Sequence, residues 1–414
     1  MSRPKVAHVT TVAISLQALL LNQLRSIQDA GYEVVGISSP GTGVAAVEAI
    51  GVRHVAVPMT RRFTPGTDLL SLWRLYRVMR RERFAIVHTH TPKAGLLGQL
   101  AARMAGVPVV INTLHGLYFH EQTPALKRVC YIALEKAAAR CSHLVLSQNR
   151  EDVETVVRAR ICAPGEVRHL GNGIDLAAFD PGRQGAADRR SLQQSLALPA
   201  GAKVVGFVGR LAAARKGFLD FLRAAQEVAK HDGATYFLVV GEADHGKADA
   251  VEPSAAAAFG IWDRCRFLGQ RPNSELPRLY ALMDVLVLPS IFEGIPRVVM
   301  EASAMGVPTV ATDVKGNREA VEAGRTGLLV PYGDVAALAR SLLELLADGE
   351  KARRMGQEAR RLALQRFDER RVFETVKAEY ARLLVAKGLA VPEIGPPVEA
   401  CAGPASSGSP APAA

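Results

Sequence analysis

The sequence predicts an α/β protein with two tandem Rossmann-like, doubly wound domains, and three observations support this. Short β-branched runs alternate with longer helical stretches from residue 5 onward. The runs are almost continuously apolar, as expected of parallel strands that are buried on both faces of a sheet. The alternation starts again near residue 203, and 414 residues exceed one ordinary domain of roughly 150 residues.

The first series contains six strand candidates, and segments with helical spacing separate them. Residues 15–31 show the helical pattern, because apolar residues recur at helical intervals and Gly31 provides a stop. Helices that alternate with parallel strands cover the faces of one sheet. The six candidates are residues 6–10, 33–39, 53–58, 84–90, 107–113 and 142–147.

The second series repeats this theme toward the C-terminus. Turn-forming Gly, Asn, Asp and Pro crowd residues 171–182, so we expect the two domains, residues 1–172 and 173–370, to join there. A last helix at 371–389 is expected to cross back to the first domain. A tail at 390–414, rich in Pro, Ala, Gly and Ser, is expected to be disordered. The strand candidates are residues 203–209, 235–241, 265–270, 284–290, 308–313 and 327–331.

The composition is that of a soluble globular protein, with 49% hydrophobic and 22% charged residues. No apolar run reaches the roughly 18 residues that span a bilayer, which excludes an integral membrane protein. The opening residues lack an apolar segment with a cleavage site, so we expect a cytoplasmic location. The cysteines are too scattered for a disulfide framework or a structural zinc site (Cys130, Cys141, Cys162, Cys265 and Cys401).

The net charge of +11 is concentrated in the first part of the chain, where residues 1–180 hold 21 Lys and Arg against 13 Asp and Glu. Residues 68–84 combine many arginines with Leu69, Leu72, Trp73 and Tyr76 at helical spacing. Two interpretations stay open. The segment is a helix that buries this apolar face in the first domain, or it contacts an anionic membrane surface peripherally.

The richest chemical signal lies in residues 293–316. Glu293 and Gly294 follow the strand candidate at 284–290, and Pro296 suits the first position of a helix that contains Glu301. Unpaired N–H groups at residues 295–298 would form an anion site there. The two glutamates then reach opposite ends of one elongated ligand, unless they are an ordinary loop glutamate and a solvated helix glutamate.

The spacing from Glu293 to Glu301, with Gly294, Pro296 and residues 311–316, resembles the signature of glycosyltransferase family 4, the retaining GT-B glycosyltransferases. Residues 208–218, 171–181 and 324–334 resemble the donor-diphosphate loop, the interdomain segment and the late strand of this family. The opening and residues 87–121 are similar to members that build capsular, exopolysaccharide or lipid-linked glycans. The resemblance covers about residues 5–385. It implies a GT-B fold in which the first domain binds the acceptor and the second binds a nucleotide sugar across a cleft.

The resemblance also implies roles for single residues. Arg210 and Lys216 would neutralise the donor diphosphate, whose charge grows as the glycosidic bond breaks. The family spaces these cations one residue closer, so Arg215 is an alternative to Lys216. Glu301 would bind the ribose, Glu293 a donor-sugar hydroxyl, and His115 would border acceptor and donor sugar unless it is a core histidine. The neighbouring substrate-binding positions are Gly294, Ile295, Pro296 and Arg297, the last with a phosphate or acceptor contact.

Two further features bear on metals. His88 and His90 share one strand face, but no third ligand is near in sequence, so we do not expect them to bind a metal, and a role in lining the cleft stays open. The chain also lacks a pair of aspartates of the D-x-D type after a strand. We therefore expect no metal and no cofactor, with the nucleotide sugar as a substrate.

The sequence is thus interpreted as a retaining glycosyltransferase that uses a front-face route, in which the departing phosphate helps to remove the acceptor proton. The expected partners are a UDP-linked N-acetylated hexose and a polysaccharide or polyprenyl-linked glycan acceptor, and not nucleic acid. Two alternatives remain. A nucleotide-sugar 2-epimerase shares the architecture but not the glutamate motif. A nucleic-acid-binding protein would suit the pI of 9.6, yet aromatic residues are only 6%.

Overall fold

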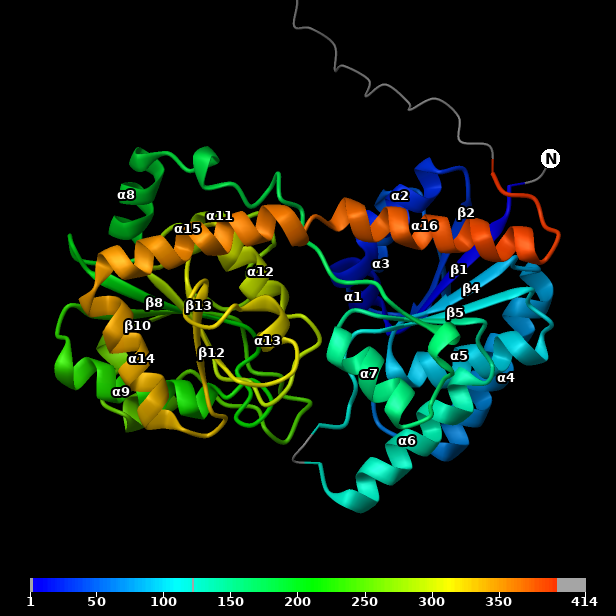
Figure 1. Ribbon diagram of the computed structural model, residues 1–414, viewed down its shortest axis with the longest axis horizontal. Coiled ribbons are helices and arrows are strands. Elements are labelled where there is room, and N and C mark those ends of the chain that lie inside the picture. The colour runs from blue at the N-terminus through cyan, green and yellow to red at the C-terminus, as the bar shows by residue number, and fades with distance from the viewer. Residues whose placement is uncertain (1–2, 121–122, 393–414) are drawn as a thin grey trace, which may run out of the picture.

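The computed structural model describes residues 3–120 and 123–392 and contains two parallel sheets, each covered by helices (Figure 1). The first sheet has seven strands in the order β3-β2-β1-β4-β5-β6-β7. The switch in strand order lies between β1 and β4, where doubly wound sheets place their ligands. The strands are β1 (Lys5–Val12), β2 (Glu33–Ser39), β3 (Arg53–Ala56), β4 (Ile86–Thr89), β5 (Val109–Leu114), β6 (Leu144–Ser147) and β7 (Val167–His169).

Helices cover both faces of this sheet because every crossover between its parallel strands needs one. A five-residue π-helical stretch, Leu16–Leu20, interrupts the first crossover. The helical elements are α1 (Ala13–Ser15), α2 (Leu21–Asp29), α3 (Val44–Ala49), α4 (Pro65–Glu82), α5 (Pro92–Met104), α6 (Ala125–Ala139), α7 (Arg150–Arg158) and the 3₁₀ turn Pro164–Glu166.

The second sheet has six strands in the order β10-β9-β8-β11-β12-β13. It consists of β8 (Lys203–Val208), β9 (Thr235–Val240), β10 (Cys265–Phe267), β11 (Val285–Leu288), β12 (Thr309–Thr312) and β13 (Gly327–Val330). Its helices are α8 (Ala186–Ser195), α9 (Phe218–His231), α10 (Ala255–Ala258), α11 (Leu276–Tyr280), α12 (Arg297–Ala304), α13 (Asn317–Ala320), α14 (Val335–Ala347) and α15 (Gly349–Arg366). Two 3₁₀ turns, Pro181–Arg183 and Trp262–Arg264, complete this half.

The last helix, α16 (Glu369–Ala386), returns to the first sheet. Its residues Val376, Tyr380, Leu383 and Leu384 are buried in the same apolar cluster as strands β1, β2, β4 and β5. The polypeptide therefore crosses between the halves twice, near Ile174 and near Phe367. These two crossing segments are in contact, because the amide of Ile174 donates to the carbonyl of Phe367 at 2.9 Å. In Figure 1 α16 runs across the top of the first half.

The predicted fold class is confirmed, because all twelve strand candidates occur and every strand pairing within the two sheets is parallel. The edge strand β7 was not foreseen, because its three residues are too few to show a pattern. Residues 390–414, which we expected to be disordered, lie almost entirely outside the described residues. Within the described part of the chain, no helix combines the length and the apolar character needed to cross a bilayer.

Candidate active site

The loops that follow β8 and β11 meet, because these strands are neighbours in the second sheet and point the same way. The first loop carries Lys216 and the second carries Glu293. Lys216 Nζ donates a 2.5 Å hydrogen bond to Glu293 Oε1, and the two side chains are only 18% and 10% exposed. The stem of Lys216 passes along Gly209, where a Cβ would lie 3.9 Å from Lys216 Cδ. An ammonium group is thus fixed at the carboxyl edge of the sheet.

Arg210, from the same loop as Lys216, is held by an aspartate that the sequence analysis did not single out. Its Nη1 donates to Asp244 Oδ2 at 3.0 Å, and Arg61 of the first half approaches the same oxygen at 3.5 Å. Burial raises the pKa of Asp244, but the hydrogen bond and charge of Arg210, with the charge of Arg61, bring it below the usual value. Asp244 lies in the loop after β9, which ends at Val240, and this position at the carboxyl edge of the sheet was the signal that could have identified it.

Arg215 faces a different environment from Lys216. Its guanidinium lies over the ring of Phe292 at 4.9 Å from the centroid, and Phe292 stacks on His120. The Nε atom of Arg215 is buried and has no hydrogen-bond partner among the described residues. Lys216 is therefore the cation that contacts Glu293, while Arg215 packs against the aromatic ring beside it.

Gly294 lies against the first half of the molecule by direct backbone contact. A Cβ at Gly294 would stand 2.5 Å from the carbonyl oxygen of His115. Gly316, at φ +78°, closes the other side, because a Cβ there would stand 1.8 Å from the oxygen of Gly294. Side chains at these two positions would force the loops apart, so glycine is required for the close approach.

Two asparagines hold this segment from the other half of the molecule. Asn149 Nδ2 donates to the carbonyl of Gly294 at 3.1 Å, and Asn172 Nδ2 donates to the carbonyl of Ile295 at 3.2 Å. Neither residue was singled out in the sequence, although Asn149 also caps α7 by accepting from the amide of Asp152. The turn before α12 is thereby fixed against the first half.

Glu301 lies on α12 and is almost completely buried, with 3% exposure. Its carboxylate accepts a 2.9 Å hydrogen bond from Tyr280 Oη and lies 3.7 Å from Arg297 Nε. Burial raises the pKa of Glu301, while Arg297 and Tyr280 oppose the rise. Arg297 follows Pro296, which serves as the N-cap of α12, and it lines a small cavity together with His115 and Glu369. Arg297 thus stands between Glu301 and the cleft.

His115 follows β5, and its ring points toward the interior of the first half. Its Nε2 lies 3.4 Å from His90 Nδ1. His88 and His90 are buried, and His8 on the neighbouring strand β1 brings a third imidazole beside them. Ring nitrogens of these three histidines lie within 4.8 Å of one another. The sequence analysis missed His8 because only the strand pairing shows that it faces His88.

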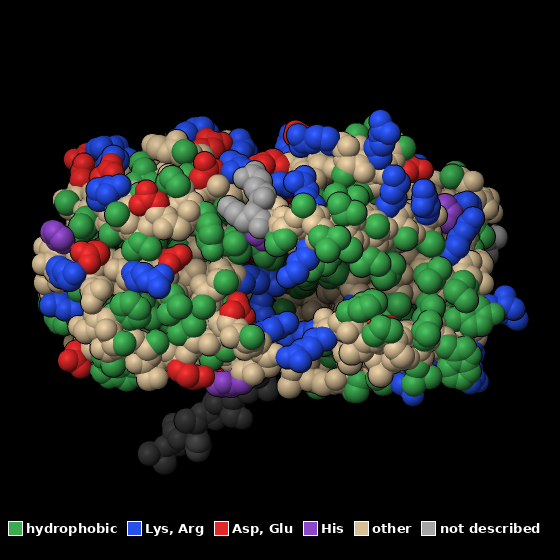
Figure 2. Space-filling model, turned by 90° about the horizontal axis from the view of Figure 1, so that it is seen from below, with side chains coloured by type: hydrophobic (Ala, Val, Ile, Leu, Met, Phe, Trp, Pro, Cys, Tyr) green, Lys and Arg blue, Asp and Glu red, His purple; other side chains and the backbone are tan. Residues whose placement is uncertain are grey.

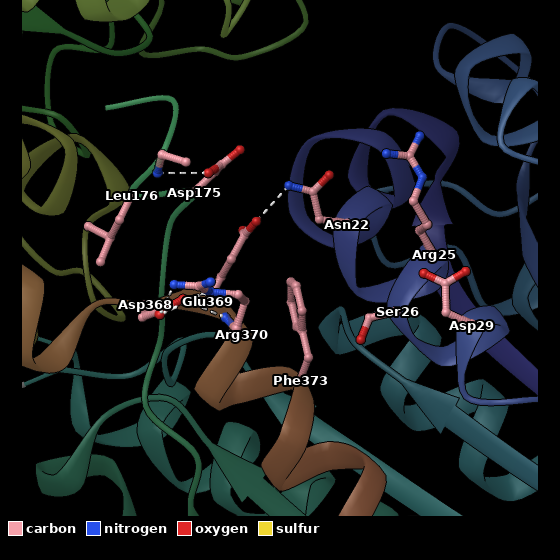
Figure 3. A pocket seen from close by; sticks show the side chains of 11 residues that line it. Asn22, Arg25, Ser26, Asp29, Asp175, Leu176, Asp368, Glu369, Arg370 and Phe373 are labelled. Atoms are coloured by element: carbon pink, nitrogen blue, oxygen red, sulfur yellow. Dashed lines mark hydrogen bonds and ion pairs between the residues drawn. The ribbon is translucent and has the colours of Figure 1, made fainter. Parts of the chain in front are cut away.

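A cavity of about 380 Å³ lies where the two segments that cross between the halves meet α2 (Figure 3). Its walls come from α2, from residues 175–177 and from the start of α16. Asn22 Nδ2 donates to Glu369 Oε1 at 2.6 Å across this cavity. Glu369 also lines the small cavity beside His115, so the start of α16 adjoins the candidate site.

The helix expected at residues 68–84 is α4, and its expected apolar face is only partly buried, because Leu72 and Tyr76 pack against the core. Leu69 and Trp73 are 68% and 51% exposed, while Asp68 is buried. The buried side chains of α4 are instead Asp68, Ser71, Leu75 and Met79, and Asp68 Oδ1 is paired with Lys93 Nζ at 2.7 Å. Figure 2 shows apolar and basic side chains gathered on this half of the molecule, with few acidic ones.

Comparison with known proteins gives consistent results for both halves. Residues 17–178 match the family model described as Glycosyltransferase Family 4, and residues 202–348 match the one described as Glycosyl transferases group 1. The UDP-Gal:alpha-D-GlcNAc-diphosphoundecaprenol alpha-1,3-galactosyltransferase of Escherichia coli is 27% identical, over 93% of this chain and 99% of the relative. The 2-deoxystreptamine N-acetyl-D-glucosaminyltransferase of Streptomyces fradiae is 30% identical, over 82% and 84%.

Solved structures agree in fold. Anabaena Alr3699/HepE in complex with UDP and glucose superposes with a TM-score of 0.78 at 21% identity, covering 92% of this chain and 100% of that one. WaaG, a glycosyltransferase involved in lipopolysaccharide biosynthesis, superposes with a TM-score of 0.72 at 16% identity, covering 91% and 99%.

Proposed function

The chain belongs to glycosyltransferase family 4, and we propose that it transfers an N-acetylated hexose from a UDP-sugar, with retention of configuration, to a polysaccharide or polyprenyl-linked glycan. Three relatives support the class of acceptor and donor. The Escherichia coli relative is named for a UDP-sugar donor and a diphosphoundecaprenol acceptor. The Staphylococcus aureus relative CapM, 26% identical, is named for capsular polysaccharide biosynthesis, and the Streptomyces relative for N-acetylglucosaminyl transfer.

The observation that carries the proposal is the half-buried pair of Lys216 and Glu293, with Arg210 on the same loop as Lys216. As the glycosidic bond breaks, negative charge accumulates on the donor diphosphate. Cations that are already in place stabilise this charge without reorganisation in the transition state. Glu293 holds Lys216 in position, and its Oε2 atom has no hydrogen-bond partner among the described residues, which leaves an acceptor for a sugar hydroxyl.

A front-face route fits this arrangement better than a double displacement. A double displacement needs a carboxylate nucleophile next to the anomeric carbon, as in retaining glycosidases. Glu293 accepts a hydrogen bond from Lys216, and Glu301 is enclosed by Tyr280 and Arg297. We therefore assign the removal of the acceptor proton to the departing phosphate, held by Arg210 and Lys216.

The outer face of the first half fits a lipid-linked acceptor at an anionic membrane. On α4 the exposed Leu69, Leu70 and Trp73 adjoin four arginines, and Arg77 lies over the ring of Trp73 at 4.7 Å. On α6 only Ala138 is buried, and exposed Leu126 and Val129 alternate with basic residues. Apolar side chains flanked by cations bind the interface of anionic bilayers. Both helices begin at the carboxyl edge of the first sheet, where the acceptor would enter.

The test is product analysis with a panel of UDP- and GDP-sugars, in the presence and absence of a polyprenyl-diphosphate-linked N-acetylhexosamine and in excess EDTA. We expect release of UDP that depends on the acceptor, an extended glycolipid with the anomeric configuration of the donor, and no loss of rate in EDTA. A product formed from the UDP-sugar alone would identify a 2-epimerase instead. Strict dependence on a divalent metal would contradict the proposed role of the two cations.

A further inference from the structure

A chain of buried polar side chains runs from the C-terminal helix to His115. Thr113 Oγ1 lies 2.7 Å from His88 Nε2, and His88 Nδ1 lies 2.6 Å from Tyr380 Oη. The same Tyr380 oxygen lies 3.3 Å from His8 Nε2. His8 Nδ1 lies 2.9 Å from His90 Nε2, and His90 Nδ1 lies 3.4 Å from His115 Nε2. The side chain of His115 also forms a hydrogen bond with the side chain of Gln148.

Every ring nitrogen of His8, His88 and His90 has a partner within this hydrogen-bonded chain of side chains. Burial lowers the pKa of His8 to about 3 and that of His115 to about 4, so the rings are neutral at physiological pH. A neutral imidazole donates from one nitrogen and accepts at the other. If one ring in the chain changes tautomer, its neighbours must change as well, or two donors or two acceptors will face each other. The chain therefore has two complete arrangements of opposite direction.

Three observations favour a hydrogen-bonded chain over a metal centre. The nitrogens that a metal would need already contact Tyr380, Thr113 or another imidazole. The described residues provide no carboxylate in the cluster to balance a divalent charge, and an unbalanced buried charge is costly. The rings are 0–3% exposed, which offers no entry path to an ion.

We propose that Tyr380, His8 and His90 are positioning residues for His115, and that this chain sets the tautomer and ring orientation of His115 in the active site. The proposal rests on the proposed function, in which the loop of His115 borders the reacting groups. The carbonyl of His115 lies against Gly294. The residue whose ring ends the hydrogen-bonded chain therefore lies at the contact between the two halves. Because Tyr380 belongs to α16, the hydrogen-bonded chain connects this last helix to the site.

The first test is Tyr380→Phe in the full chain, which removes one oxygen and keeps the ring. Long-range ¹H–¹⁵N spectra of protein labelled at histidine report the tautomer of each ring directly. In the wild type we expect matched tautomers for His8, His90 and His115, so that the hydrogen-bonded chain runs in one direction throughout. In the variant we expect a mixture for His115, and a turnover number three- to tenfold lower with less than a twofold change in the donor KM.

The matched control is Tyr32→Phe. Tyr32 packs edge-on against Tyr380 with ring centroids 5.8 Å apart, and it is buried in the same apolar cluster, but its hydroxyl is not a member of the chain. We expect this variant to keep both the tautomers and the turnover number. Equal effects of the two substitutions would show that the hydroxyl of Tyr380 acts only through packing and would overturn the proposal.

A second pair of variants remains informative if Tyr380→Phe does not fold. His90→Gln keeps one donor and one acceptor, whereas His90→Leu has neither, so we expect Gln to retain most of the turnover that Leu loses. An unchanged His115 tautomer in His90→Leu would contradict the proposal. So would stoichiometric zinc in the purified wild-type protein, because the rings would then be ligands. The tautomer measurement does not require sugar transfer, so its outcome is independent of the proposed activity.

Discussion

Lys216 Nζ lies 2.5 Å from Glu293 Oε1, and this contact joins the two loops that a donor diphosphate would touch. The ammonium is in place before any ligand arrives, because the carboxylate holds it. Preorganised charge of this kind lowers the barrier of a step in which negative charge develops. The pair is thus the most direct link between the geometry of this chain and its proposed chemistry.

Replacing Lys216 with Ala should lower the turnover number at saturating donor by at least tenfold, which corresponds to about 1.4 kcal/mol. Arg210→Ala should have a similar effect, and Arg215→Ala a smaller one, because Arg215 packs on Phe292. Steady-state kinetics measures these values. Lys230→Ala, on the exposed surface of α9, is the control. Wild-type turnover in both Lys216→Ala and Arg210→Ala would refute the assignment.

Glu301→Gln should weaken the binding of UDP about tenfold, because the proposed ribose hydrogen bonds exist in ground and transition states alike. Glu293→Gln should leave UDP binding nearly unchanged and reduce turnover, since its partner Lys216 acts mainly on developing charge. Calorimetry with UDP separates the two effects. If both variants lose nucleotide affinity equally, the division of roles between the glutamates is incorrect.

Acid should destabilise the protein through its buried histidines. Burial lowers the pKa of His8 to about 3 and that of His115 to about 4, and it places His88 and His90 well below the usual value. Below about pH 6.5 the unfolded chain binds protons that the folded chain does not bind. Stability therefore falls as the pH drops from 7 to 5, by up to about 1.4 kcal/mol per unit for each histidine.

Urea unfolding at pH 7 and pH 5 measures this slope. His90→Gln should reduce the slope, because one titrating group is removed, whereas His231→Gln at an exposed position should not. A slope that is the same in wild type and His90→Gln would mean that this ring does not remain neutral in the folded state.

Membrane association should be weak, reversible and sensitive to salt. Each arginine near an anionic surface contributes about 1 kcal/mol. Changing Arg77, Arg80 and Arg81 to Glu should therefore abolish sedimentation with anionic vesicles, without affecting UDP binding in the other half. Replacing the exposed Leu126 and Val129 by Ser should reduce binding without changing charge. If the wild-type protein does not bind anionic vesicles at low salt, a soluble acceptor becomes the better proposal.

The strands were predictable because burial on both faces leaves a continuous apolar run, which needs no knowledge of the fold. The contacts of the site were not predictable in the same way. His8 and His88 are 80 positions apart and meet only through the pairing of β1 with β4. On α4 the exposure of Trp73 and the burial of Asp68 beside the distant Lys93 do not follow from the local pattern. Local patterns indicate which face an element buries on average, whereas contacts with distant residues decide which side chains that face contains.

The return of α16 to the first sheet has a consequence for biosynthesis. Val376, Tyr380, Leu383 and Leu384 complete the apolar core beneath β1 and β4, yet the ribosome adds them after the whole second half. Domains ordinarily fold in the order in which they are made. Here the half that is made first cannot close its core until the chain is almost finished, and until then its apolar surface is available to chaperones. Premature termination anywhere in the second half thus produces a fragment that cellular quality control can recognise.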